Sequence, residues 1–162
     1  MDATHVIHPF EPICDINCRI LILGSFPSVK SRETSFYYGH KQNRFWKVLS
    51  FIYNAKEPIS IEEKTNFLLD NHTAIWDVIK SCDIIASSDS SIKNVTVNDI
   101  AFLCKQFNIN KIFANGKTSA DLYNRYIYPT SDIPIVQLPS TSPANAAYSL
   151  ERLIEAWKVI IK

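Results

Sequence analysis

The sequence predicts an α/β fold in which a parallel sheet is covered by helices on both faces, giving three layers. Three times along the chain, a short aliphatic or β-branched run is followed by a polar loop and then by apolar residues at helical spacing. Such strand, loop and helix units are typical of parallel sheets. The length of 162 residues and the hydrophobic content of 46% suit one substantial core. We therefore expect residues 1–162 to form a single domain.

The first unit begins with a strand expected at residues 19–23, which read RILIL. The loop GSFPS follows, and then the stretch FYYGHKQ. From about Asn43 the apolar residues recur at helical spacing, so we expect a helix that packs one apolar side against the sheet. That side carries Phe45, Trp46, Leu49 and Ile52.

The second and third units follow the same order. A strand expected at 111–114 leads through Asn115 and Gly116 into a helix near 119–126. A strand expected at 133–137 leads through the loop LPSTSPAN into a helix of about 146–161. In an open parallel sheet, ligands bind beyond the carboxyl ends of the strands, so we expect the three loops to meet at one site.

The segments between these units contain further signals. Ser60 and Glu63 have the spacing of a capping box, which predicts the start of a helix. Residues 73–79 form a short apolar run, and the polar composition of 81–94 predicts a loop. We expect Asn98 to cap a helix that ends near Phe107.

Charge and composition limit the classes of function. The chain carries a formal net charge of +1, so a contact with nucleic acid has to rely on a local patch. Residues 30–47 contain five basic residues and a single acidic one, Glu33, which gives a local excess of +4. Such a charge suits phosphate binding, and a solvated surface is the alternative. No apolar run reaches the ~20 residues of a membrane helix, and no signal peptide is recognisable. We expect a cytoplasmic protein that does not contact membranes.

We expect neither a metal nor a cofactor. The four cysteines, at positions 14, 18, 82 and 104, form no C-x-x-C pair of the kind that binds zinc. The three loops hold no close pair of carboxylates, no metal-binding cluster and no nucleophile beside a base. They offer aromatic rings, amides and hydroxyls, which suit a planar, hydrogen-bonding heterocycle such as a flipped nucleobase. Phe26 is the best candidate for stacking, whereas Phe45 has core packing as an equal alternative.

Several blocks together resemble the hypoxanthine-DNA glycosylases of the uracil-DNA glycosylase superfamily. These blocks are GSFPS, YYGHKQNRFW, AIWDVIKSCD, the Asn115-Gly116 pair and LPSTSPANA, and the resemblance runs from about residue 8 to 161. It implies a short, mostly parallel four-stranded sheet flanked by helices. It also implies a metal-free enzyme that hydrolyses the N-glycosidic bond of a deaminated base in DNA and leaves an abasic site.

The resemblance implies specific roles in catalysis. Most branches of the superfamily position the attacking water with an Asp or Asn at the place where this chain has Phe26. In the branch that this chain resembles, the asparagine at position 43 takes that role. Without the resemblance, the position of Asn43 just before an apolar-periodic segment favours the role of a helix N-cap. One residue can both cap the helix and position the water. Leu138 stands where several branches have a histidine that stabilises the departing base. His40 is a candidate substitute, against the alternative of a structural histidine.

The resemblance also implies contacts with the base and with DNA. Asn115 matches the position that reads the base edge, although an asparagine before glycine is also an ordinary turn residue. The LPSTSPAN block is expected to enter the minor groove. The expected base-binding residues are Gly24, Ser25, Phe26, Tyr38, Phe45 and Asn115. The expected DNA-binding residues are Ser28, Lys30, Lys41, Arg44, Ser140, Thr141, Ser142, Pro143, Ala144 and Asn145.

Taken together, these patterns predict a monomeric, monofunctional DNA glycosylase. Its partner is DNA that contains a deaminated base, with hypoxanthine as the leading substrate and uracil or xanthine as further ones. A non-catalytic nucleic-acid or nucleotide-binding module is the main alternative, because stacking rings and phosphate contacts serve binding equally well. A serine hydrolase that uses Ser25 or Ser28 lacks a matched base.

Overall fold

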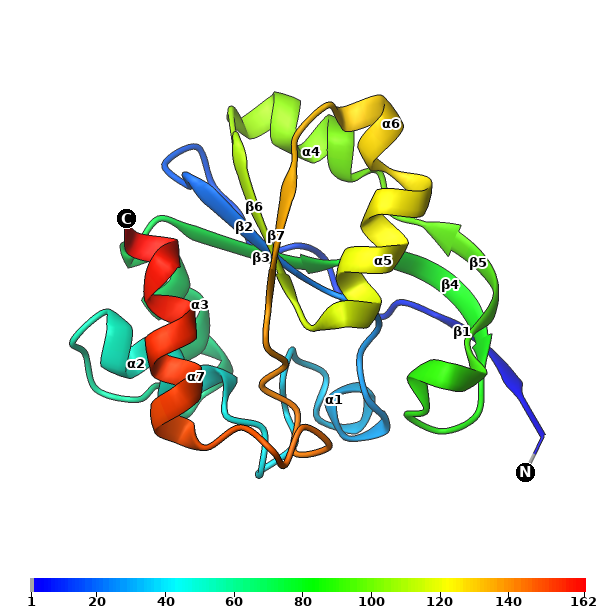
Figure 1. Ribbon diagram of the computed structural model, residues 1–162, viewed down its shortest axis with the longest axis horizontal. Coiled ribbons are helices and arrows are strands. Elements are labelled where there is room, and N and C mark those ends of the chain that lie inside the picture. The colour runs from blue at the N-terminus through cyan, green and yellow to red at the C-terminus, as the bar shows by residue number, and fades with distance from the viewer. Residues whose placement is uncertain (1) are drawn as a thin grey trace.

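A computed structural model describes residues 2–162; residue 1, the first of the expected domain, lies outside them. The centre of the fold is a four-stranded sheet in which all neighbouring strands are parallel, as Figure 1 shows. In spatial order its strands are β3 (Thr73–Asp77), β2 (Ile20–Gly24), β6 (Lys111–Asn115) and β7 (Ile135–Leu138). The predicted short, parallel, four-stranded sheet is confirmed.

The register of the sheet brings four strand ends together. Gly24, the last residue of β2, lies opposite Asp77, the last residue of β3. On the other side of β2, the next strand β6 ends at Asn115, which pairs with Leu138 of β7. The loops that follow β2, β6 and β7 therefore leave the same edge of the sheet, as the sequence predicted.

Helices cover both faces of this sheet (Figure 1). On one face, Ile22 packs in a core with Phe45, Leu49 and Trp157. On the other face, Leu21 packs with residues of the opposite helical layer. The first layer consists of α2 (Phe45–Ile52), α3 (Ile61–Asp70) and α7 (Leu150–Trp157), which continues as η2 (Lys158–Ile161). The second consists of α4 (Ile100–Phe107), α5 (Lys117–Tyr126) and α6 (Tyr128–Ser131). The three-layer α/β architecture is thus confirmed.

A second sheet was not predicted. Its strands, β1 (Thr4–Ile7), β4 (Ile79–Ile84) and β5 (Lys93–Val97), pair antiparallel in the order β1-β4-β5. The interpretation of residues 81–94 as a loop was wrong for both ends of that stretch, and only its middle is irregular, with the turn η1 (Asp89–Ser91). Two shifts of register between β4 and β5 interrupt the regular alternation of buried and exposed residues by which a strand is recognised.

Local capping explains where the helices begin. The predicted capping box of Ser60 and Glu63 is present at the start of α3. The prediction for Asn98 was wrong: Asp99 caps α4, while the Asn98 amide donates to the carbonyls of Asp77 and Ile79. The helix expected at 146–161 begins later, because Ser149 caps α7. The short helix α1 (Val29–Thr34) lies in the loop after β2 and was not predicted.

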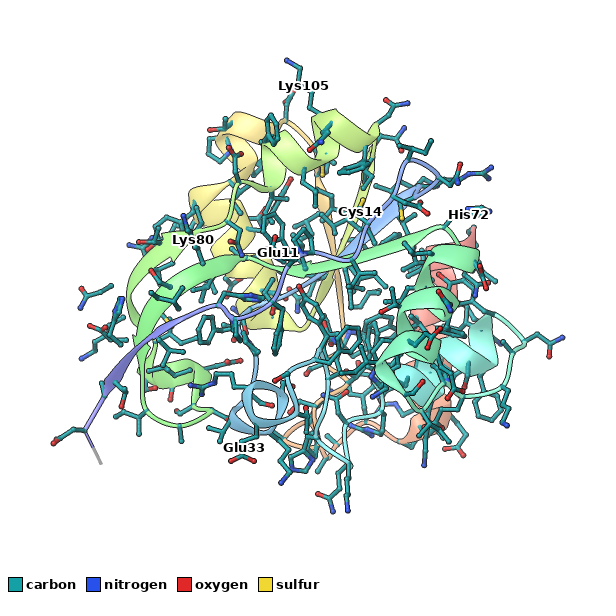
Figure 2. All side chains as sticks on the ribbon, turned by 180° about the vertical axis from the view of Figure 1, so that it is seen from behind. Glu11, Cys14, Glu33, His72, Lys80 and Lys105 are labelled. Atoms are coloured by element: carbon teal, nitrogen blue, oxygen red, sulfur yellow. The ribbon has the colours of Figure 1, made fainter. Side chains whose placement is uncertain are left out.

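The segment between β1 and β2 runs along the outer strand of the central sheet. Ile13 forms an antiparallel bridge with Ile75 of β3, and the amide of His8 donates to the carbonyl of Lys80. Figure 2 shows this segment from behind, with Glu11 and Cys14 labelled along it. The course of the segment brings His8 to the end of β3. Within residues 2–162, no helix is both long and apolar enough to cross a membrane.

Candidate active site at the carboxyl ends of the parallel strands

A cavity of about 310 Å³ lies where the loops after β2, β6 and β7 meet. Its size falls at the lower end of the ~300–1,000 Å³ that small-molecule sites occupy. Most of the predicted site residues line it. They are Gly24, Ser25, Phe26, Ser28, Tyr38, Asn43, Asn115, Ser140, Thr141, Ser142 and Ala144. The structure therefore brings together three loops that are distant in sequence.

Thr141 links the two asparagines of the cavity by hydrogen bonds. Its backbone N–H donates to Asn115 Oδ1 at 2.9 Å, and its hydroxyl oxygen accepts from Asn115 Nδ2 at 2.9 Å. The Thr141 hydroxyl in turn donates to Asn43 Oδ1 at 2.8 Å. Because the backbone N–H can only donate, it determines which end of the Asn115 amide is oxygen. Thr141 is fully buried, so this orientation is shielded from water.

The same logic orients Asn43. Its Oδ1 accepts from the backbone N–H of Phe45 at 2.9 Å as well as from the Thr141 hydroxyl. The first of these bonds is an Asx turn just before α2. The N-cap of α2 is Arg44, which makes no side-chain cap bond, so the expectation that Asn43 caps the helix was wrong by one residue. A carbonyl oxygen has two lone pairs, and both are used here. The Asn43 group that is left to act in the cavity is therefore the donor Nδ2.

Tyr38 and Phe45 were both expected to contact a base, but they lie differently. Tyr38 lines the cavity, whereas Phe45 is fully buried and does not line it. The two rings stack with centroids 4.0 Å apart, so Phe45 supports Tyr38 from behind. The Tyr38 hydroxyl oxygen is buried and makes no hydrogen bond to any of residues 2–162. Burial raises the pKa of Tyr38 well above its usual range, the Asp77 carboxylate adds to this, and the Asn115 amide opposes it.

Phe26 lies at the border between the cavity and a small core. It lines the cavity, yet only 9% of its surface is exposed, because it packs on Ile79 and Cys82 of β4. The His8 ring stands edge-on to it at 6.0 Å. These contacts hold the Phe26 ring in one orientation at the cavity wall.

The Arg44 side chain binds the backbone of the loop between β7 and α7. Its guanidinium donates to the backbone carbonyls of Tyr148, Ser142 (3.2 Å) and Asn145 (3.0 Å). The loop between β7 and α7 needs such donors because it contains few backbone hydrogen bonds of its own. The Arg44 donors thus hold this loop, and the expected contact of Arg44 with phosphate stays a prediction.

The other predicted residues lie outside the cavity lining. His40 Nδ1 accepts from the backbone N–H of Gln42 at 3.0 Å, which is a turn contact. Lys30 pairs with Glu33 at 3.4 Å on the surface, and Lys41 is exposed. Pro143 is half-buried, and Asn145 donates to the Ser140 carbonyl at 3.0 Å. His40 thus meets the cavity lining through its backbone carbonyl, which accepts from the Asn43 N–H at 2.9 Å, while its imidazole makes the turn contact.

Two important residues, Asp77 and His8, were missed. Asp77 lines the cavity, and its Oδ2 accepts a hydrogen bond of 2.7 Å from His8 Nε2. The His8 and Asp77 side chains are only 3% and 5% exposed. A Cβ atom at position 24 would collide with Asp77 Oδ1, which is why a glycine ends β2. The available signal was the block AIWDV: its aspartate ends a strand that neighbours β2, but no polar loop and helix follow it.

A second carboxylate, Asp89, also lines the cavity. Ser25 donates to its Oδ1 at 3.4 Å. Partial burial raises the pKa of Asp89, hydrogen bonds from Thr118 and Ser25 act in the opposite direction, and the nearby Asp77 charge adds to the rise. The three loops alone contain no carboxylate pair, but the structure adds one carboxylate from β3 and one from the turn after β4. Among residues 2–162, no three His, Cys, Asp or Glu side chains are grouped so as to hold a metal ion.

Comparisons with known proteins agree with this architecture. The family profile described as the uracil DNA glycosylase superfamily matches residues 11–160. A hypoxanthine DNA glycosylase of Methanosarcina acetivorans is 31% identical over 94% of this chain and 96% of its own length. A protein of the same name from Methanosarcina barkeri is 34% identical over 69% of this chain and 72% of its own length.

A solved structure gives the same result for the fold. The solution structure of a candidate uracil DNA glycosylase from Methanosarcina acetivorans superimposes with a TM-score of 0.81. It is 30% identical in sequence, and the match covers 96% of each chain. The family profile spans nearly the whole chain, and the strand ends, the cavity and the fold agree with it. We conclude that this chain belongs to the uracil DNA glycosylase superfamily.

Proposed function

We propose that this protein is a monofunctional DNA glycosylase that removes hypoxanthine from DNA and leaves an abasic site. The observation that carries the proposal is the cavity at the strand ends, in which buried hydrogen bonds fix two amides beside the ring of Tyr38. Its polar groups suit a flat heterocycle that has been turned out of the duplex. The names of the two Methanosarcina relatives support hypoxanthine as the base. Uracil and xanthine are proposed as further substrates.

Hydrolysis proceeds by attack of water on the sugar carbon C1′, while the bond from C1′ to the base nitrogen breaks. The electron pair of that bond leaves with the base, and the water loses a proton to solvent. Asn43 orients the water by donating from Nδ2, because its oxygen is occupied. An amide cannot take up a proton, so most of the rate acceleration comes from stabilising the charges on the departing base and on the sugar.

Contacts with DNA are proposed for the loop between β7 and α7 and for nearby lysines. Ser140 and Ser142 line the rim of the cavity, and Ala144 is exposed beside them. Lys30 and Lys41 carry charges on the surface that can contact phosphates. Arg44 serves this contact indirectly, because it holds the loop in place. We further propose that residues 1–162 form one glycosylase domain, which acts as a monomer in the cytoplasm.

The proposal is tested with duplexes that carry a single hypoxanthine, uracil or xanthine, followed by alkaline cleavage of the abasic product. We expect product from the hypoxanthine duplex, no strand cleavage before alkali, and no product from an unmodified duplex. Absence of product from all three lesions would contradict the enzyme. In that case, retained binding of DNA would favour a non-catalytic binding module.

Replacement of Asn43 by serine separates its two roles. Serine forms the same turn with the Phe45 N–H more weakly, so the unfolding free energy is expected to fall by no more than about 1 kcal/mol. The variant lacks the amide donor, so we expect excision of hypoxanthine to slow by about 100-fold or more. Ser149→Asn is the matched control, because it exchanges the same residue types at the cap of α7, away from the cavity. Unchanged turnover in Asn43→Ser would refute the role of Asn43.

A further inference from the structure

Asp77 presents one oxygen to the cavity that no neighbouring donor uses. Its Oδ2 is taken by His8 Nε2 at 2.7 Å. Its Oδ1 lies against the backbone of Gly24 and has no hydrogen-bond donor among residues 2–162. The strand pairing of Gly24 with Asp77 fixes this position, since both residues end their strands at the same level. The result is a rigid hydrogen-bond acceptor at the floor of the cavity.

His8 is built into the fold so that it can only support Asp77. Its ring is packed among the rings of Phe10, Phe26 and Tyr37, with centroids 5.4 to 6.0 Å away. Its Nδ1 lies 2.9 Å from the Phe10 carbonyl and 3.1 Å from the Phe10 N–H. With Nδ1 accepting from the Phe10 N–H, the imidazole proton lies on Nε2, which donates to the Asp77 carboxylate. Such a donor orients the carboxylate as a positioning residue.

Tyr38 places a donor beside this acceptor. A Cβ atom at position 24 would lie 3.2 Å from the Tyr38 hydroxyl and would also touch Asp77 Oδ1, so both atoms border the same point of Gly24. The hydroxyl is buried and makes no hydrogen bond within residues 2–162. A buried hydroxyl without a partner is costly, so its presence in a cavity points to a ligand that supplies an acceptor.

We propose that Asp77 and Tyr38 recognise the lactam edge of the base, with the Asp77 carboxylate accepting the ring N–H and the Tyr38 hydroxyl donating to the adjacent carbonyl. This inference rests on the proposed glycosylase function. Deamination converts a ring nitrogen from an acceptor into an N–H donor and the neighbouring amino group into a carbonyl. An acceptor beside a donor matches that product and opposes the parent base, whose ring nitrogen turns a lone pair toward the carboxylate.

The recognition has a defined scope. Hypoxanthine, xanthine and uracil all carry an N–H beside a carbonyl, so the pair accepts all three. It separates hypoxanthine from adenine and uracil from cytosine. Guanine and thymine carry the same edge, so their exclusion rests on the walls around the guanine 2-amino group and the thymine 5-methyl group. The role of Asp77 is thus to distinguish hypoxanthine from adenine and uracil from cytosine, whereas xanthine and guanine share the edge that it contacts.

The test compares hypoxanthine with 1-methylhypoxanthine, which keeps the carbonyl and replaces the N–H by a methyl group. We expect the wild type to excise hypoxanthine at least about 10- to 100-fold faster, the factor that loss of a charged hydrogen bond produces. Difficulty in opening the duplex cannot explain the difference, because the methylated base does not pair well and is turned out more easily. Asp77→Ala removes the carboxylate and makes room for the methyl group, so we expect the ratio of the two rates to fall toward one.

The outcomes separate this inference from the function on which it rests. A wild type that releases no deaminated base overturns both. The second outcome is a wild type that excises hypoxanthine and an Asp77→Ala variant in which both rates fall equally, so that their ratio persists. It overturns the proposed contact of Asp77 with the base N–H and leaves the glycosylase function intact. An Asp77 that positions the attacking water, rather than the base, would produce this second outcome. Asp77→Ser, which also makes room for the methyl group and keeps an oxygen that can accept from His8, provides a second variant in case Asp77→Ala does not fold, and we expect the same fall in the ratio.

The His8 contact is tested by the same ratio. His8→Leu removes the donor to Asp77, and we expect the preference for hypoxanthine to fall several-fold. His8→Gln retains an N–H donor, and we expect it to restore the preference at least partly. His5→Gln is the matched control, because His5 also binds an aspartate, Asp83, but on the surface and outside the cavity. A ratio that is the same in His8→Leu and in the wild type would contradict the positioning role.

Discussion

Two histidines of the N-terminal segment, three residues apart, each bind an aspartate with nearly the same bond length. His5 Nδ1 lies 2.8 Å from Asp83, and His8 Nε2 lies 2.7 Å from Asp77. We call these the surface pair and the site pair. The side chains of the surface pair are 60% and 29% exposed, whereas those of the site pair are 3% and 5% exposed. The bond length alone therefore does not indicate what each pair contributes.

The two pairs differ in how much each contributes to stability, because water reaches the surface pair and not the site pair. Around the surface pair, water solvates either partner if the other is removed, so the interaction contributes little. Inside the protein, removing one partner leaves the other without solvent and without a hydrogen bond. The site pair is thus expected to be indispensable once formed, although forming it required the removal of two polar groups from water. A fold retains such a pair where the orientation of the buried group matters.

The largest effect is expected for replacement of His8 by alanine. The change leaves the Asp77 carboxylate buried without its donor and opens a gap among the rings of Phe10, Phe26 and Tyr37. We expect the free energy of unfolding to fall by about 3–5 kcal/mol, measured by urea denaturation. The control is His5→Ala, for which no measurable change is expected. Equal losses in the two variants would contradict the distinction between the pairs.

A smaller effect is expected for Arg44, a half-buried cation whose guanidinium donates to backbone carbonyls. Arg44→Lys keeps the charge, but an ammonium cannot reach the three carbonyls that the guanidinium binds. We expect a loss of about 1–3 kcal/mol in unfolding free energy, because buried carbonyls lose their donors. In Arg44→Gln, which removes the charge, the slope of DNA affinity against salt is expected to stay unchanged, because the wild-type guanidinium is engaged by these carbonyls.

Lys41 provides the contrast with Arg44. It is exposed, and Lys41→Ala is expected to leave the unfolding free energy unchanged while reducing the salt slope by about 1. Both residues were interpreted from the sequence as phosphate contacts. If Arg44→Gln reduced the salt slope and Lys41→Ala did not, the assignment made from the hydrogen bonds of Arg44 would be wrong.

The sequence predicts the fold better than it predicts the site. Apolar periodicity identified three strands of the central sheet and most of the helices that cover it, because burial determines both the pattern and the packing, while it marked β3 only as a short apolar run. It missed β4 and β5, where bulges disturb the alternation. The loops after β2, β6 and β7 were correctly expected to meet, since the ends of parallel strands share one edge.

The partners of individual polar side chains were less predictable. Nothing local in the sequence indicates that Arg44 reaches the carbonyls of residues 142–148, about 100 positions later. Asp77 was overlooked because it ends a strand that leads directly into the second sheet, and His8 because it comes from a segment before the first predicted strand. These contacts depend on three-dimensional packing, which the apolar pattern does not record.

The smallest effect concerns the surface pair and its dependence on pH. Hydrogen bonds from Asn94 (2.6 Å) and from His5 hold the pKa of Asp83 below its ordinary value. A depressed pKa in the folded state stabilises the fold above the unfolded pKa of about 4, and this contribution disappears as the pH falls through the folded value. Asn94 has a backbone φ of 55°, which glycine adopts without strain, so Asn94→Gly removes the stronger of these two hydrogen bonds without a backbone penalty. We expect a slightly lower Tm than that of the wild type at pH 7 and Tm values that converge as the pH falls through the folded-state pKa of Asp83. A Tm difference that persisted at low pH would show that Asn94 acts through packing rather than through the charge of Asp83.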